Sequence, residues 1–185
     1  MSVTVETPST VVATPPAIPR LESGDRLGRA EFERRYQAMP PGVRAELLEG
    51  VVYVMASPLN LSHHGNPHAQ LMAWVVNYEA ETPGVISGDN ATVRLDWKNE
   101  PQPDILLAIQ PEAGGQARIE ADGHLAGAPE LIAEIAASSA AIDLHAKKGI
   151  YARSGVLEYV VWDTLTPALH WFRLDGGDYV SVEDD

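Results

Sequence analysis

Short apolar runs separated by proline and glycine dominate the hydrophobic pattern of the chain. Residues 105–109 and 131–137 form two such runs, each preceded by a segment that contains proline. Runs of this length between turn-forming residues are typical of buried strands. Each run also carries a carboxylate, with Asp104 directly before the first and Glu134 in the middle of the second. Because a buried carboxylate is costly unless it is paired, hydrogen-bonded or bound to a metal, the two strands indicate one shared acidic site.

Apolar residues at helical spacing predict three helices. They are expected at residues 28–38, 63–82 and 140–154. Ser62 is the expected N-terminal cap of the second helix. Gly155 follows the third helix, at the position that a C-terminal cap prefers.

Alternating and continuous apolar runs predict several strands. A hairpin is expected across residues 44–55, because two apolar runs flank Glu49 and Gly50, and Glu46 lies inside its first strand. Residues 110–128, rich in Gly and Ala, are expected to form a surface loop. The remaining strands are expected at 85–87, 91–97, 158–163, 168–174 and 179–182. This order predicts a mixed β-sheet flanked by helices, with β-hairpins, in the α/β or α+β class.

The length of 185 residues suggests one domain with tails. Residues 1–22 are rich in Ser, Thr, Val and Pro and lack a helical period, which predicts a flexible leader. The domain is then expected at residues 23–185. Because 45% of the residues are hydrophobic, that domain can bury a sizeable core.

The composition limits the ligands that a metal site could have and the partners that the protein could bind. The chain has no cysteine, so a metal site needs oxygen or nitrogen ligands. No apolar run approaches the roughly 18 residues of a membrane span, and no signal peptide is visible, so we expect a cytoplasmic protein. The formal net charge of −13 weighs against non-specific nucleic-acid binding, which rests on Lys and Arg, unless one local face is basic.

A lysine accompanies the carboxylates. Glu46, Asp104 and Glu134 all belong to predicted strands, and Lys147 falls on a largely apolar side of the predicted helix that follows. Carboxylates suit hard divalent cations such as Mg²⁺ or Mn²⁺. Such an ion can activate water, and a lysine can neutralise charge that develops on a phosphate. The set therefore supports hydrolysis of a phosphodiester.

Several short motifs follow one another in a specific order. They are Glu46–Gly50, His64 with Leu71, Gln102–Ile105, Pro129–Ile135, Asp143–Leu144 with Lys147, and Tyr151–Val156 with Glu158–Asp163. Over roughly residues 28–175, this set resembles the Uma2 family of restriction-endonuclease-like proteins, within the wider PD-(D/E)XK nuclease fold. The resemblance implies an endonuclease that uses Mg²⁺ or Mn²⁺ to hydrolyse DNA. It also implies that Asp104 and Glu134 are metal ligands and that Glu46 is an upstream acid that supports the metal.

The catalytic lysine departs from the usual pattern of this fold. That lysine commonly lies two residues after the second acid, where this chain has Ala136. The resemblance implies that a lysine on the next helix replaces it. Lys147 matches that position, and Lys148 remains the alternative.

Two other functions stay open at this point. The first is a nuclease-fold protein that binds a protein or nucleic acid without cutting, and it is distinguished by whether the acids and the lysine converge. The second is a metal site built on His64 and His68, although Pro67 disturbs that turn. A capping or surface role is the stronger prediction for His63, His64 and His68, and a position of His64 at the border of the cleft stays open. Apolar edges on the C-terminal hairpins further predict a homodimer.

Overall fold

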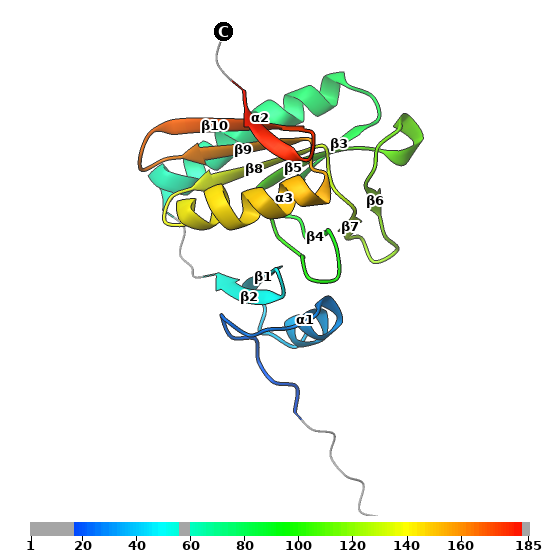
Figure 1. The fold of residues 1–185 in the computed structure, drawn as a ribbon, viewed down its shortest axis with the longest axis vertical. Coiled ribbons are helices and arrows are strands. Elements are labelled where there is room, and N and C mark those ends of the chain that lie inside the picture. The colour runs from blue at the N-terminus through cyan, green and yellow to red at the C-terminus, as the bar shows by residue number, and fades with distance from the viewer. Residues whose placement is uncertain (1–16, 56–59, 183–185) are drawn as a thin grey trace, which may run out of the picture.

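Six strands form the central sheet of the fold (Figure 1). The computed structural model describes residues 17–55 and 60–182 of the chain. The strands, in the order β11-β10-β9-β8-β5-β3, are Asp178–Ser181, Ala168–Asp175, Glu158–Asp163, Leu131–Ala136, Ile105–Ile109 and Val85–Asp89. β8 and β9 pair in parallel, whereas every other neighbouring pair in this sheet is antiparallel. The sheet is therefore mixed, as predicted.

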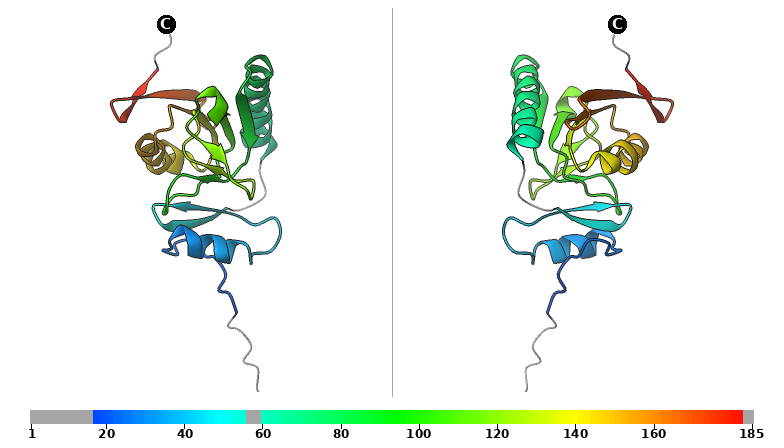
Figure 2. Two further views of the ribbon diagram at one scale, coloured as in Figure 1. Left: turned by 90° about the vertical axis from the view of Figure 1, so that its right-hand side faces the viewer. Right: turned by 90° about the vertical axis from the view of Figure 1, so that its left-hand side faces the viewer.

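Two helices cover opposite faces of this sheet, as both views in Figure 2 show. α2 (Asn66–Glu81) lies on one face and α3 (Lys148–Ser154) on the other. Side chains alternate between these faces along β5. Ile105 packs in the cluster that contains Val75 of α2, whereas the next residue, Leu106, packs in the cluster formed with α3. β5 and β8 are thus buried on both faces, which explains their continuous apolar sequences.

A smaller unit lies beneath the sheet in Figure 1. It consists of α1 (Arg29–Tyr36), β1 (Arg44–Leu48) and β2 (Val51–Met55). β1 and β2 form the predicted hairpin, and the turn residues Glu49 and Gly50 have φ angles of 51° and 76°. Left-handed conformations at both positions suit a tight hairpin turn.

The predicted loop at residues 110–128 is wrong, because this segment contains regular structure. It holds a short 3₁₀ turn at Pro111–Ala113 and the strands β6 (Arg118–Ile119) and β7 (Leu125–Ala126). The predicted strand at 91–97 is reduced to β4 (Val93–Arg94), which pairs in parallel with β7. Two-residue strands are too short to produce a periodic pattern, so β6 and β7 were not predicted.

Wide π-helical turns precede two of the helices. η1 (Leu61–Gly65) leads into α2, and η3 (Ile142–Lys147) leads into α3. Ser62 is not the cap of the second helix. The side chain of Asn60 accepts hydrogen bonds from the backbone N–H groups of Ser62 and His63, so it satisfies the free donors that a cap must satisfy.

The predicted leader at residues 1–22 lies mostly outside the described residues, as does the part of the predicted loop at 57–59. Within 17–22, Leu21 is buried against Phe32 and Val52. The division into a leader and one domain remains a prediction. Among the helices of the described residues, none is both long enough and apolar enough to cross a membrane.

Candidate active site

Asp104 and Glu134 lie side by side on the two central strands. Ile105 pairs with Ala133 in the antiparallel register of β5 and β8, so the residues before and after this pair are neighbours. The backbone N–H of Asp104 donates to Glu134 Oε2 at 3.3 Å, and the backbone N–H of Ile135 donates to Asp104 Oδ2 at 2.8 Å. The two carboxylates thus form one buried acidic pair at this position of the sheet.

Glu46 reaches the same position from the hairpin. Leu47 and Glu100 exchange two backbone hydrogen bonds of 3.1 and 2.8 Å, which fix β1 against the segment that leads into β5. Glu46 Oε1 then accepts a hydrogen bond of 2.7 Å from the backbone N–H of Gln102. The hairpin therefore contributes a third carboxylate to the acidic pair.

Lys147 lies between the carboxylates. Its Nζ is 2.9 Å from Glu134 Oε1 and 3.0 Å from Glu46 Oε1, and its side chain is only 6% exposed. Lys148 instead places its ammonium 3.7 Å from the centre of the Phe172 ring. Of the two candidate lysines, the structure brings Lys147 to the acids and directs Lys148 elsewhere.

Two further side chains join the cluster from η3 and α3. Asp143 Oδ1 lies 3.7 Å from Lys147 Nζ, and Tyr151 donates its hydroxyl hydrogen bond to Glu134 Oε1 at 3.0 Å. Asp143 and Tyr151 lie four residues before and after Lys147. This helical spacing is the signal that could have identified both.

His64 joins the cluster from η1. Its Nε2 lies 3.2 Å from Asp104 Oδ1, while His68 Nε2 lies 3.2 Å from both Asp89 Oδ1 and the Asp104 carbonyl oxygen. The two imidazole rings stack with their centres 5.7 Å apart. Both histidines therefore flank the acidic pair. For His64 this is the alternative that the sequence left open, whereas for His68 it differs from the predicted surface or capping role.

Electrostatics keep Lys147 charged. Burial alone would lower the pKa of Lys147, but the nearby carboxylates, Glu134 foremost, outweigh it and raise this pKa above its usual value. Burial also raises the pKa of Glu134 well above its usual value, and three neighbouring carboxylates add to this rise while Lys147 opposes it. The carboxylates of the cluster thus oppose one another's ionisation, and Lys147 offsets this effect only in part.

Asp104 shows the opposite shift. Burial would raise the pKa of Asp104, but hydrogen bonds from the His64 ring and from the backbone N–H of Ile135 lower it. The same contact with Asp104 raises the pKa of His64. Asp104 therefore stays ionised at neutral pH.

The donor set suits a hard divalent cation in chemistry and in charge. The cluster holds four buried carboxylates, of which Glu46, Glu134 and Asp143 lie within 3.7 Å of the Lys147 ammonium, while Asp104 lies beside Glu134. Carboxylate oxygens are the ligands that Mg²⁺ and Mn²⁺ prefer, and an added cation would stabilise their ionised forms. Within residues 17–55 and 60–182, no three His, Asp or Glu side chains are already arranged around an ion position. A bound ion would therefore share these carboxylates with Lys147.

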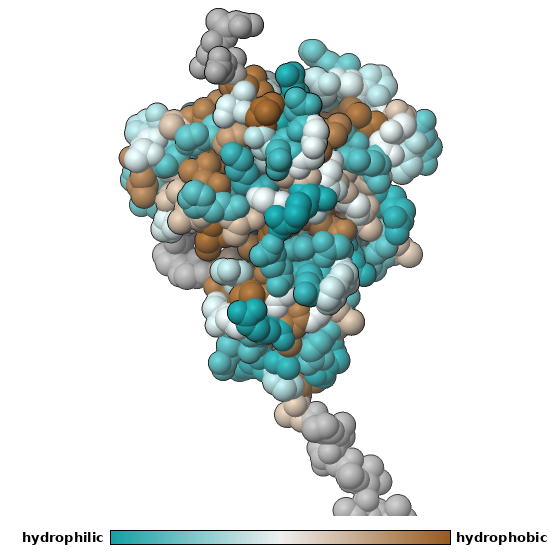
Figure 3. Space-filling model, in the orientation of Figure 1, coloured by the Kyte–Doolittle hydropathy of each residue, from teal (hydrophilic) through white to brown (hydrophobic). Residues whose placement is uncertain are grey.

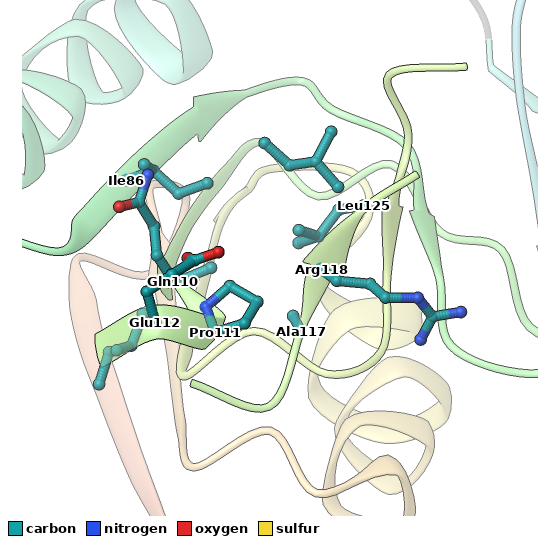
Figure 4. Close-up of a pocket in the computed structure, with 10 residues that line it drawn as sticks. Ile86, Gln110, Pro111, Glu112, Ala117, Arg118 and Leu125 are labelled. Carbon is teal, nitrogen blue, oxygen red and sulfur yellow. The ribbon is translucent and has the colours of Figure 1, made fainter. Parts of the chain in front are cut away.

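Two surface cavities lie elsewhere. One, of about 310 Å³, is lined mainly by apolar side chains near the end of β5 and by β6 and β7 (Figure 4). The other, of about 400 Å³, lies at the hairpin turn and is lined mainly by polar and charged residues. None of the four buried carboxylates lines either cavity. The face shown in Figure 3 is largely hydrophilic, with small hydrophobic patches.

Together, the mixed sheet and its flanking helices define a restriction-endonuclease-like α+β protein. The family model of Uma2, described as "Putative restriction endonuclease", matches residues 29–185. The chain therefore belongs to the Uma2 family, as its motifs predicted, and this membership supports a nuclease function.

One solved structure supports the same fold. The chain is similar to a protein from Anabaena variabilis ATCC 29413 described as "a putative nuclease belonging to DUF820", with 12% sequence identity and a TM-score of 0.61. The similarity covers 82% of this chain and 83% of that chain. At this identity the comparison shows the fold alone. No curated protein matches this chain.

Proposed function

We propose that this protein is a metal-dependent endonuclease that hydrolyses phosphodiester bonds in DNA. The observation that carries this proposal is the position of the Lys147 ammonium, within 3.0 Å of carboxylates from both the hairpin and the central sheet. Family membership adds independent support for nuclease chemistry. Asp104 and Glu134 would hold the metal, Glu46 would assist them, and Mg²⁺ or Mn²⁺ is the ion that this donor set favours.

Lys147 acts as a fixed positive charge in this proposal. Its raised pKa means that it does not remove a proton from water at neutral pH. Its ammonium carries three N–H donors. Glu134 Oε1 accepts one of them at 2.9 Å, and oxygens of Glu46 and Asp143 lie 3.0 and 3.7 Å away. In this proposal, a donor that these carboxylates do not use orients the attacking water or stabilises a phosphate oxygen. When bound, a divalent ion would supply an activated water and stabilisation of developing charge.

The carboxylates differ in their assigned roles. Asp104 stays ionised because its pKa is lowered, so it attracts a cation across the neutral pH range. Glu134 has a raised pKa and accepts hydrogen bonds from Lys147, Tyr151 and the backbone of Asp104. These donors favour its ionised form and fix its orientation toward the site.

Burial of the site favours a second candidate function. The side chains of Glu46, Glu134 and Lys147 are only 5–6% exposed, as expected for a structural ion-pair network. In that case the protein would bind nucleic acid or a protein without cutting. The two candidates differ in whether metal and intact acids are needed for strand cleavage.

Plasmid cleavage separates these functions. Supercoiled plasmid is incubated with the wild type in EDTA, Mg²⁺ or Mn²⁺, and with Asp104→Asn under the same conditions. We expect nicking only with metal, and a loss on the order of 100-fold or more in Asp104→Asn. Asp175→Asn, at an exposed position of the C-terminal hairpin, is the matched control and should cleave like the wild type. Metal-independent cleavage, or equal cleavage by Asp104→Asn, would contradict the proposal.

A homodimer forms part of this proposal. Trp162 pairs with Leu169, and Trp171 lies two residues further along β10, so all three side chains share the face of the sheet that carries α2. Leu169 is exposed and both tryptophans are half-buried, which supports an apolar contact with a second copy. Light scattering of the wild type and of Leu169→Lys tests this, because the charged variant should be monomeric. A wild type that is itself monomeric would refute the dimer.

A further inference from the structure

Three segments meet at the hairpin turn and hold one exposed tryptophan. The backbone N–H of Gly50 donates to the carbonyl of Lys98 at 2.9 Å, and that of Leu27 donates to the carbonyl of Gly50 at 2.8 Å. The backbone N–H of Arg29 donates to the carbonyl of Trp97 at 2.9 Å. The loop that carries Trp97 is therefore fixed by backbone contacts on two sides.

Side chains within the loop fix it further. Asp96 accepts from the backbone N–H of Lys98 at 2.6 Å and from the side-chain amide of Asn99 at 2.8 Å, and Asn99 in turn accepts from the backbone N–H of Glu49 at 2.7 Å. Despite this rigid support, the Trp97 indole is 66% exposed. Packing within the chain does not account for a large aromatic side chain held outward in this way.

Two cationic side chains share a cavity with the exposed indole. The ammonium of Lys98 lies 4.4 Å from the centre of the Trp97 ring, and Arg153 of α3 lines the same cavity of about 400 Å³. Arg153 pairs with Glu49, but both side chains are more than 60% exposed. Such an exposed pair contributes about 1 kcal/mol at most, so Arg153 can exchange Glu49 for a phosphate.

Asp96 and Asn99 are already engaged in the loop itself. Beside the exposed carboxylate of Glu49, the groups left to meet a ligand are the indole, the ammonium of Lys98 and the guanidinium of Arg153. An aromatic face flanked by two cations matches a nucleotide, whose base stacks and whose phosphate is anionic. Two neighbouring cations beside an exposed aromatic ring contrast with the net charge of −13 of the whole chain.

The cavity also lies within reach of the candidate active site. Residues 98–102 run beside the hairpin turn and β1, through Gly50 at one end and Glu46 at the other. From Trp97 to Gln102 an extended backbone spans at most roughly 17 Å. That distance corresponds to about five nucleotides at the 3.4 Å rise of a strand. Trp97 therefore lies close enough for one short strand to extend from it toward the segment that holds Glu46.

We propose that Trp97, Lys98 and Arg153 form a binding site for unpaired nucleotides of the nucleic-acid substrate. A base stacks on the indole of Trp97, and flanking phosphates contact Lys98 and Arg153. The faces of paired bases are hidden within a duplex, so the site selects single-stranded or unpaired segments. This inference rests on the proposed nuclease function and adds a substrate class to it.

Binding is measured separately from cleavage to test this site. Fluorescence anisotropy in EDTA compares a labelled single-stranded 20-mer with the matching duplex. We expect the wild type to prefer the single strand, and Trp97→Ala to weaken its binding roughly tenfold to a hundredfold. Trp97→Phe should retain most of the affinity, because a phenyl ring still stacks. Trp74→Ala, which removes an exposed tryptophan from α2, is the matched control and should bind like the wild type.

Several outcomes would overturn the inference. They are unchanged binding by Trp97→Ala with an intact fold by circular dichroism, no preference for the single strand, and no binding by the wild type. If Trp97→Ala binds like the wild type and the wild type nicks plasmid, this binding site is refuted while the proposed nuclease function stands. If Trp97→Ala loses binding while the wild type cleaves nothing, the site stands and the nuclease function fails.

Discussion

Lys147 Nζ lies 2.9 Å from Glu134 Oε1, in a cluster where carboxylates outnumber buried ammonium groups. The ion pair joins η3 to β8, the central strand that also holds Asp104 in place through Ile135. This contact therefore links the packing of the helical segment between β8 and β9 to the balance of charges in the candidate active site. Its removal should affect stability, metal affinity and cleavage together.

Lys147→Met should leave the carboxylates of Glu46 and Glu134 buried without their cation. We expect the free energy of unfolding in EDTA to fall by about 3–5 kcal/mol. We also expect Mn²⁺ to raise the melting temperature of the variant more than that of the wild type, because the metal then meets no competing ammonium. Thermal denaturation with and without Mn²⁺ measures both effects. An unchanged response to Mn²⁺ would argue against a metal position among these acids.

Glu46→Ala should weaken the attachment of the hairpin to the sheet. The substitution leaves the backbone N–H of Gln102 without its acceptor and removes one of the two short contacts of Lys147. A loss of about 3 kcal/mol in the free energy of unfolding is expected. Glu49→Ala, in the adjacent turn and exposed, should change it by about 0.5 kcal/mol or less. Urea denaturation of both variants provides the comparison, and equal losses would show that Glu46 has no special structural role.

Tyr151→Phe should shift the pH dependence of cleavage. The hydroxyl donates to Glu134, so its removal destabilises the ionised carboxylate and raises the pKa of Glu134 further. The acidic limb of the pH–rate profile should therefore move to higher pH, with a stability loss of about 1 kcal/mol. A reduced rate with an unmoved profile would mean that the hydroxyl acts only on packing.

The raised pKa of Glu100 predicts that the free energy of unfolding depends on pH. Burial, together with a hydrogen bond to Glu33, raises the pKa of Glu100 to about 8 from a usual value near 4.5. Between these values the folded state holds the proton more tightly, so the free energy of unfolding should fall as pH rises from about 4.5 to 8, by a few kcal/mol at most. Glu100→Gln should reduce this slope. Urea denaturation at several pH values measures it, and identical slopes would contradict the assignment.

Much of the fold could be predicted because its strands carry local signals. β5 and β8 appear in the sequence as apolar runs, each preceded by a proline, because both of their faces are buried. The hairpin followed from Glu49 and Gly50, whose positive φ angles match a tight turn. By contrast, β6 and β7 are two residues each, too short for an alternating pattern to predict them. β4 lies within the predicted strand at 91–97 but is only two residues long, and its partner β7 is distant in the sequence.

The candidate site was predictable in part. The structure brings Glu46, Asp104, Glu134 and Lys147 together, while their catalytic and metal-binding roles remain proposals. His64 belongs to one of the motifs, but its contact with Asp104 was harder to predict, because that contact depends on how η1 packs against the sheet.

The catalytic role of Lys147 is the central claim, since this fold commonly places its lysine where the chain has Ala136. Nicking of supercoiled plasmid in Mg²⁺ by Lys147→Met and Lys148→Met, at equal folded fractions, tests it most directly. The account predicts that Lys147→Met loses cleavage on the order of 100-fold or more, while Lys148→Met cleaves like the wild type. Equal activity in the two variants, or greater loss in Lys148→Met, would contradict it.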